Sequence, residues 1–227
     1  MEKEKYLERI KYIGKLTADV ECLTELHRNH LFYIPFENLD VYSGKGISLD
    51  LENIYEKIVL NRRGGFCYEL NYLFHWLLTE LGFICRMISA RVINDAGEPG
   101  PEFDHMAIYI DAGPRYLADV GFGDLFLKPL EFKTDEVQYD GRNYFMIQDQ
   151  GSKGYLLMMS ADGIQFKREY LFTLKKRTIQ DFMPLCLDKQ VNPDSHFVNT
   201  RICTKFTPEG RWTIRNNQWI ETINNEK

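Results

Sequence analysis

Hydrophobic residues in the first third of the chain recur at helical spacing. The spacing predicts one helix over residues 18–31 and another over residues 50–60, for which Asp50 is a suitable N-cap. A third helix is expected to begin at Cys67 or just before it, because the apolar residues that follow repeat at i, i+3, i+4, i+7, i+8 and i+11. Gly82 ends this helix, so the first third is predicted to be helical.

After Gly82 the chain changes to short runs of β-branched and aromatic residues separated by turn signals. The predicted strands cover residues 84–93, 103–111, 115–120, 143–149, 155–160 and 165–172. Their spacing favours a mainly antiparallel sheet or barrel. The last part of the chain is expected to hold a short helix and two strands, over residues 179–187, 200–206 and 211–220.

Composition and charge indicate a globular protein without a nucleic-acid-binding face. The 227 residues are 44% hydrophobic, which is enough for a sizeable core. The net charge is -5, and the lysines and arginines are scattered apart from one short run at residues 175–177. The N-terminus is charged throughout, which predicts neither a signal peptide nor a membrane span and therefore a cytoplasmic protein.

Five cysteines at irregular, wide spacings predict reduced thiols rather than a disulfide framework. No CxxC or HxxxH pair occurs, so no metal site is expected. Cys67 differs from the others because it opens a predicted helix, where unpaired N–H groups and the helix dipole favour a thiolate. Gly64 and Gly65 are expected to let the backbone bend so that the thiol projects into a cleft. The alternative is a small core residue below a helix stop.

A predicted hairpin brings a histidine to an acid. The sequence DAGPR between two apolar runs predicts a turn, so the strand carrying His105 should pair antiparallel with the strand carrying Asp119. With Ile110 near Tyr116, His105 falls opposite Asp119 or a residue within two positions of it, about 5 to 8 Å away. The alternative is a strand histidine satisfied beside a turn acid. Together with the thiol, the pair has the logic of a nucleophile, a base and an orienting acid.

Other polar residues receive ordinary interpretations. Glu37 lies between apolar residues and is expected to pair with Arg63, which would brace the loop before the nucleophile. The alternative is two unrelated surface charges. His27 and His30 fall at the end of an early helix, where a C-terminal cation is ordinary. His196 lies in a loop that could line a cleft, with no evident partner.

The motifs IPFENLDV, RRGGFCYELN, DHM and DVGFG occur in this order, and together they resemble those of the arylamine N-acetyltransferases. The resemblance implies an α+β fold around a cysteine-protease-like Cys-His-Asp core. Its three expected parts are an N-terminal helical bundle over residues 1–83, a central antiparallel β-barrel over residues 84–175 and a C-terminal α/β lid over residues 176–227.

The resemblance also implies a reaction and the residues that serve it. The expected catalytic triad is Cys67, His105 and Asp119, and the expected acceptor pocket is lined by Phe36, Val92, Phe122 and Phe197, with Gly123 beside the pantetheine arm of coenzyme A. The family transfers an acetyl group from acetyl-CoA to aromatic amines or hydrazines, an activity of xenobiotic metabolism. Here the transfer is expected to follow a ping-pong mechanism through an acetyl-cysteine intermediate, with no metal, nucleic acid or membrane as partner.

The alternatives to acetyl transfer rest on the C-terminal end of the chain. Members of the family usually continue past the strand expected at residues 211–220, so the lid is expected to be truncated. A truncated lid would expose apolar surface that a second subunit could cover, which makes a homodimer an expected partner. The alternative functions are a truncated paralogue with weak or no turnover and another amide-forming acyl transfer on the same triad.

Overall fold

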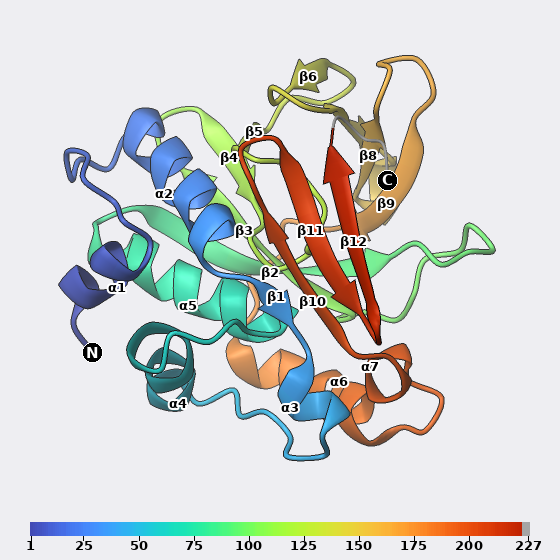
Figure 1. Cartoon of the computed structure of the whole chain (residues 1–227). Coiled ribbons are helices and arrows are strands. Elements are labelled where there is room, and N and C mark those ends of the chain that lie inside the picture. The colour runs from blue at the N-terminus through green and yellow to red at the C-terminus, as the bar shows by residue number, and fades with distance from the viewer. Residues whose placement is uncertain (224–227) are drawn as a thin grey trace.

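The structure is a computed structural model that describes residues 1–223. Its helices are α1 (Lys3–Arg9), α2 (Val20–Tyr33), α3 (Leu39–Tyr42), α4 (Leu51–Tyr55), the π-helix η1 (Glu56–Leu60), α5 (Cys67–Glu80), the 3-10 helix η2 (Gly151–Lys153), α6 (Ile179–Val191) and α7 (His196–Asn199). Its strands are β1 (Phe36–Glu37), β2 (Ile84–Val92), β3 (His105–Asp111), β4 (Arg115–Ala118), β5 (Leu130–Glu131), β6 (Val137–Tyr139), β7 (Tyr144–Asp149), β8 (Tyr155–Ser160), β9 (Lys167–Phe172), β10 (Ile202–Phe206), β11 (Gly210–Arg215) and β12 (Gln218–Ile223). Figure 1 shows their arrangement.

Eight antiparallel strands form a nearly closed barrel in the order β5-β4-β3-β2-β9-β8-β7-β6. The two edge strands meet through Gln138, whose side chain bonds the N–H and the carbonyl oxygen of Glu131 at 2.9 and 2.8 Å. The predicted antiparallel barrel is confirmed, and the predicted strands between residues 84 and 172 are found with small shifts of their ends. The short strands β5 and β6 were not among those predicted.

A second sheet has the order β1-β10-β11-β12 and crosses the front of the molecule in Figure 1. Its first strand comes from the N-terminal third, with Phe36 opposite Thr204. The prediction of a single strand over residues 211–220 is wrong, because β11 and β12 form a hairpin with Arg215 opposite Gln218. The two-residue turn between them has Asn216 at a φ of 53°, a conformation that asparagine tolerates. The three-part division of the chain stays a prediction.

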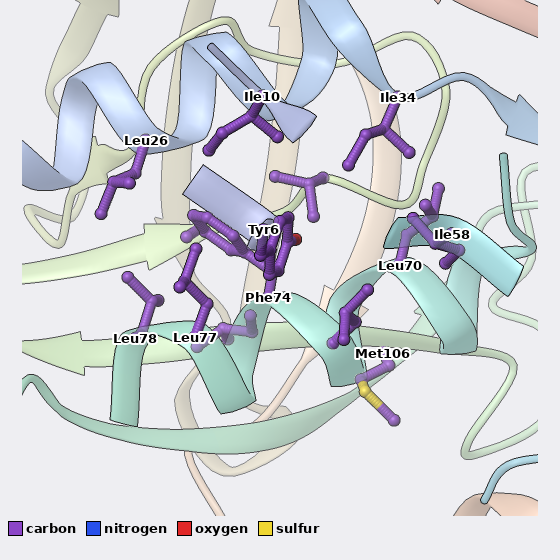
Figure 2. Close-up of a cluster of buried hydrophobic side chains, with 14 of the residues drawn as sticks. Tyr6, Ile10, Leu26, Ile34, Ile58, Leu70, Phe74, Leu77, Leu78 and Met106 are labelled. Carbon is purple, nitrogen blue, oxygen red and sulfur yellow. The ribbon is translucent and has the colours of Figure 1, made fainter. Parts of the chain in front are cut away.

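Helix α5 lies at the centre of the larger core. It packs on strands β2 and β3 of the barrel and is also contacted by α1, α4 and α6. Figure 2 shows the apolar side chains that gather here from α1, α2 and the residues directly after them, η1, α5 and β3: Tyr6, Ile10, Leu26, Ile34, Ile58, Leu70, Phe74, Leu77, Leu78 and Met106. The periodicity that predicts α5 therefore marks the face that is buried. Within residues 1–223, no helix is both long and apolar enough to cross a bilayer.

Candidate active site

The first turn of helix α5 fixes the position of Cys67. Phe66 precedes the helix with an extended backbone, and its N–H donates to the carboxylate of Glu69 at 2.8 Å. The Lys57 ammonium donates to the same carboxylate at 2.9 and 3.0 Å. Cys67 is the first residue of the helix, as the sequence predicts, and its side chain is buried. The thiol thus lies at the positive end of the helix dipole.

The two glycines before the helix permit close packing. A Cβ at Gly64 would lie 2.4 Å from the carbonyl oxygen of Pro35, and one at Gly65 would lie 2.8 Å from Ile58 Cδ1. Neither glycine has a positive φ. The structure therefore gives the glycines a steric role, since at Gly64 the chain before Cys67 passes too close to the Pro35 backbone for any side chain.

The β3–β4 hairpin brings His105 to Asp119. Ile110 lies opposite Tyr116, in the predicted register. His105 Nε2 lies 2.7 Å from Asp119 Oδ2, and both side chains are buried. The predicted imidazole–carboxylate contact is confirmed. With the Nε2 proton donated to the carboxylate, Nδ1 keeps the lone pair that a general base needs.

Asn71 holds the second oxygen of the Asp119 carboxylate. Its side-chain N–H groups donate to Asp119 Oδ1 at 2.9 Å and to the Met106 carbonyl oxygen at 2.7 Å. Its side-chain oxygen accepts from the Val120 N–H at 2.9 Å, and the Gly121 N–H donates to Asp119 Oδ1 at 3.0 Å. Sequence reasoning gave Asn71 no role, although its position four residues after the thiol on the same helix face was a usable signal.

Burial and neighbouring groups act differently on the thiol and the acid. Burial raises the pKa of the Cys67 thiol well above its usual value, and the Lys189 ammonium opposes this effect. Burial also acts to raise the pKa of Asp119, but the charge and hydrogen bond of His105, with the bonds from Asn71 and the Gly121 N–H, hold that pKa below its ordinary value. Asp119 stays ionised, and the thiol needs a base to lose its proton.

A cavity of about 320 Å³ is lined by both Cys67 and His105. Its wall also includes the five residues expected to contact the acceptor or coenzyme A: Phe36, Val92, Phe122, Phe197 and Gly123. Gly123 has a φ of 91°, and a Cβ there would lie 3.2 Å from Thr204 Cγ2, so this point of the wall requires a glycine. The structure brings these residues together, and their contacts with substrates stay predictions.

A cluster of ion pairs lies beside the same helix start. Arg63 donates to Glu37 at 2.7 Å, which confirms the predicted pair, and also to Asp40 at 2.9 Å. Lys57 contacts Asp40 at 3.1 Å and Glu69 at 2.9 Å. Through Glu69 this cluster is connected to the Phe66 N–H, which precedes Cys67. We call these five residues the ion-pair cluster.

Comparison with known proteins gives one consistent result. The family model described as N-acetyltransferase matches residues 19–227. The arylamine N-acetyltransferase pineal gland isozyme NAT-3 of Gallus gallus is 33% identical, over 92% of this chain and 79% of that protein. The structure of the arylamine N-acetyltransferase from Salmonella typhimurium has a TM-score of 0.91 at 28% identity, covering 99% of this chain and 82% of that one. The Mycobacterium marinum arylamine N-acetyltransferase in complex with CoA has a TM-score of 0.92 at 27% identity, covering 99% and 84%.

The chain belongs to the arylamine N-acetyltransferase family.

Membership in the arylamine N-acetyltransferase family confirms the resemblance and makes the chain a transferase. All five cysteines are free, as expected of reduced thiols. Among residues 1–223, no group of three or more His, Cys, Asp or Glu side chains is arranged to hold a metal ion. His196 lines a separate cavity of about 230 Å³ together with Asp104 and Lys189.

The interpretation of two histidines in this arylamine N-acetyltransferase chain is wrong. His27 and His30 are fully buried, so they are not cations at an exposed helix end. Burial lowers the pKa of His27 to about 4 and lowers that of His30 well below its usual value. His30 Nδ1 lies 2.7 Å from the Tyr6 hydroxyl, whereas His27 contacts the backbone of Asp119. Sequence reasoning missed the link between His27 and the site.

Proposed function

We propose that the protein transfers an acetyl group from acetyl-CoA to an aromatic amine or hydrazine through an acetyl-Cys67 intermediate. One observation carries the proposal: the thiol of Cys67 shares a cavity with His105, whose Nε2 is held by Asp119 at 2.7 Å. This is the arrangement of a nucleophile, a general base and an orienting acid. Family membership and the CoA complex of the M. marinum relative support the choice of donor.

The first half of the reaction charges the enzyme. The Cys67 proton passes to His105 Nδ1, and the thiolate attacks the carbonyl carbon of acetyl-CoA. The resulting tetrahedral intermediate collapses by breaking the bond to the coenzyme A sulfur, which takes the proton from His105. Asp119 stabilises the imidazolium that forms between these steps. Because burial raises the pKa of the thiol, proton transfer to His105 is what makes Cys67 nucleophilic.

The second half of the reaction discharges the enzyme. The amine nitrogen attacks the acetyl-Cys67 carbon, and His105 accepts the proton that the nitrogen loses. The carbon–sulfur bond then breaks, the amide leaves, and Cys67 takes up the proton from His105. Donor and acceptor therefore use the same thiol in turn, which gives ping-pong kinetics.

The cavity wall favours a neutral, flat acceptor. Phe122 lies edge-on to the His105 ring with the ring centroids 5.2 Å apart, and Phe197 lies edge-on to Phe66 at 4.6 Å. Aromatic amines are weakly basic and are uncharged near neutral pH, so they enter an apolar cavity without the cost of burying a charge. Lys189 and Arg211 also line the cavity, each paired at 2.6 Å with an acid on the same wall, Asp104 or Asp124. These are the cations that the negative charges of coenzyme A would meet there.

Acetyl-enzyme formation tests the proposal. The protein is incubated with acetyl-CoA alone, and its intact mass is measured and mapped by peptide digestion. We expect one acetyl group on Cys67, its loss on adding an aromatic amine, and no adduct in Cys67→Ala. Cys22→Ala, which removes another buried thiol, is the matched control and should acetylate normally. The proposal is wrong if wild type forms no adduct or if Cys67→Ala retains the wild-type transfer rate.

A further inference from the structure

One buried imidazole contacts both ends of the loop that forms much of the active-site wall. This loop, residues 119–127, follows β4 and is called the cavity loop here. It begins with the triad acid Asp119 and contributes Gly121, Phe122, Gly123 and Asp124 to the cavity. His27 reaches it from helix α2, 92 residues earlier in the chain.

His27 Nε2 lies 3.2 Å from both the backbone nitrogen and the carbonyl oxygen of Asp119. The backbone N–H of Asp119 donates to His27 Nε2 at 3.2 Å. The neutral tautomer with the proton on Nδ1 is the one that lets both nitrogens bond the loop, because its Nε2 lone pair accepts from this N–H. His27 Nδ1 lies 3.2 Å from the Leu127 carbonyl oxygen, which accepts that proton. A single neutral imidazole therefore satisfies a donor at the start of the cavity loop and an acceptor at its end.

The surroundings of His27 keep it neutral and in place. The ring is fully buried, stacks on Phe126 of the cavity loop with the centroids 5.6 Å apart, and meets Phe74 of α5 edge-on at 6.0 Å. Burial lowers its pKa to about 4, against the opposing influence of the Asp119 and Asp140 carboxylates. Asp140 also accepts from the Leu127 N–H at 2.8 Å, so the end of the cavity loop is bonded through both backbone groups.

We propose that His27 is a positioning residue for acetyl transfer, which fixes the backbone of Asp119 and the cavity loop relative to helices α2 and α5. The proposal rests on the proposed function, since it assumes that Asp119 orients His105. Asn71 and the Gly121 N–H hold the carboxylate of Asp119, whereas His27 holds its main chain. Misplacement of a catalytic group by about 1 Å costs on the order of a hundredfold in rate.

The two nitrogens of His27 have separable effects. The Nε2 contact acts on Asp119, so its loss should slow both acetylation of Cys67 and proton removal by His105. The Nδ1 contact acts on Leu127, on the far side of Phe122 and Gly123 in the sequence, so its loss should chiefly raise the KM for the amine. Glutamine places an amide near the Nε2 position, and asparagine places one near the Nδ1 position, which allows the two contacts to be kept one at a time.

The experiment compares His27→Leu, His27→Gln and His27→Asn with wild type. His30→Leu is the matched control, because His30 is equally buried on the same helix and bonds Tyr6 instead of the cavity loop. For each protein we would measure kcat and KM with acetyl-CoA and 4-methylaniline, the rate of Cys67 alkylation by iodoacetamide against pH, and the thermal midpoint. We expect His27→Leu and His27→Asn to lose about ten- to a hundredfold in kcat and to need a higher pH for alkylation. His27→Gln should stay near the wild-type kcat and pH profile.

The outcomes decide between positioning and simple packing. If His27→Leu folds and matches His30→Leu in kcat and in its alkylation profile, the proposal is overturned. If His27→Leu does not fold, the comparison of His27→Gln with His27→Asn decides, and equal kcat values in those two variants overturn it. Wild type with acetyl-CoA runs in parallel: no acetyl adduct there contradicts the proposed function itself, whereas normal wild-type acetylation leaves only the role of His27 in question.

Discussion

Two polar groupings meet the first turn of helix α5, and they differ in how their charges are arranged. The proposed triad borders a cavity of about 320 Å³, whose wall combines apolar side chains with two ion pairs, Lys189–Asp104 and Arg211–Asp124. The ion-pair cluster borders a cavity of similar size, about 340 Å³, whose wall is mostly charged and polar. Cys67 reaches the first cavity and Glu69, two residues later, reaches the second.

The two groupings differ in the partners that their charged groups contact. In the ion-pair cluster, Lys57 is shared by Asp40 and Glu69, and Arg63 is shared by Glu37 and Asp40, so each cation meets two acids.

In the triad, hydrogen bonds converge on the Asp119 carboxylate from His105, Asn71 and the Gly121 N–H. From Asp119 these contacts lead to His105, which lines the same cavity as the Cys67 thiol. Each charge of the ion-pair cluster is compensated by opposite charges, whereas the proposed triad leaves His105 Nδ1 available to act on the thiol.

The largest effect is expected from removing the negative charge of Asp119. Asp119→Asn should lower kcat by about 10⁴-fold, because the amide neither stabilises the imidazolium nor selects the correct His105 tautomer. The measurement is steady-state acetyl transfer with the folded fraction checked by circular dichroism. Asp40→Asn makes the same chemical change in the ion-pair cluster and should affect stability more than kcat. An equal loss of kcat in both variants would contradict the distinction between the two groupings.

The next effect is expected in the ion-pair cluster. Lys57→Met should lower the free energy of unfolding by about 3 to 5 kcal/mol, because it leaves the buried Glu69 carboxylate without its cation. Denaturant unfolding followed by fluorescence gives the value. The double variant Lys57→Met with Glu69→Gln removes the stranded charge and should recover part of the loss. A double variant less stable than the single one would show that Glu69 does not depend on Lys57.

The sequence predicts the local parts of this arrangement well. Periodicity places α5 and its buried face, and the hairpin turn sets the register that brings His105 to Asp119. The Glu37–Arg63 pair follows from the cost of burying an acid between apolar residues. Each of these predictions depends on a regular element or on one charge that requires a partner.

Contacts between distant elements were not predictable in the same way. Asn71 and Asp119 are 48 residues apart, and no local pattern records their hydrogen bond. His27 was misread because a histidine near a helix end suggests a cation. A usable signal was its helix face: Leu23, Leu26, His27 and His30 follow i, i+3, i+4, i+7 spacing, which places both imidazoles on the apolar side, where a neutral, partnered ring is expected.

The smallest effect is expected from mild acid, and it separates His27, which contacts the backbone of Asp119, from Asp40 in the ion-pair cluster. The folded pKa of His27, about 4, lies below the usual value of 6.5, so the unfolded chain binds the proton more readily. Stability is therefore fully present above pH 6.5 and is lost as the pH falls toward 4, by about 2 kcal/mol at pH 5. His30, whose pKa is also lowered, adds to the loss in the same direction. In the ion-pair cluster, Arg63 and Lys57 outweigh the effect of burial and hold the pKa of Asp40 below its ordinary value, so Asp40 stays charged through this window. Burial raises the pKa of Glu69 in the same cluster.

Denaturant unfolding at pH 7 and pH 5 checks this separation. Wild type should lose stability over this interval, and His27→Gln should lose about 2 kcal/mol less, because glutamine has no proton to bind. Asp40→Asn should lower stability at both pH values and leave the difference between them unchanged. If His27→Gln and wild type lose the same amount, His27 does not carry the acid response. If Asp40→Asn abolishes that response, Asp40 carries it in place of His27.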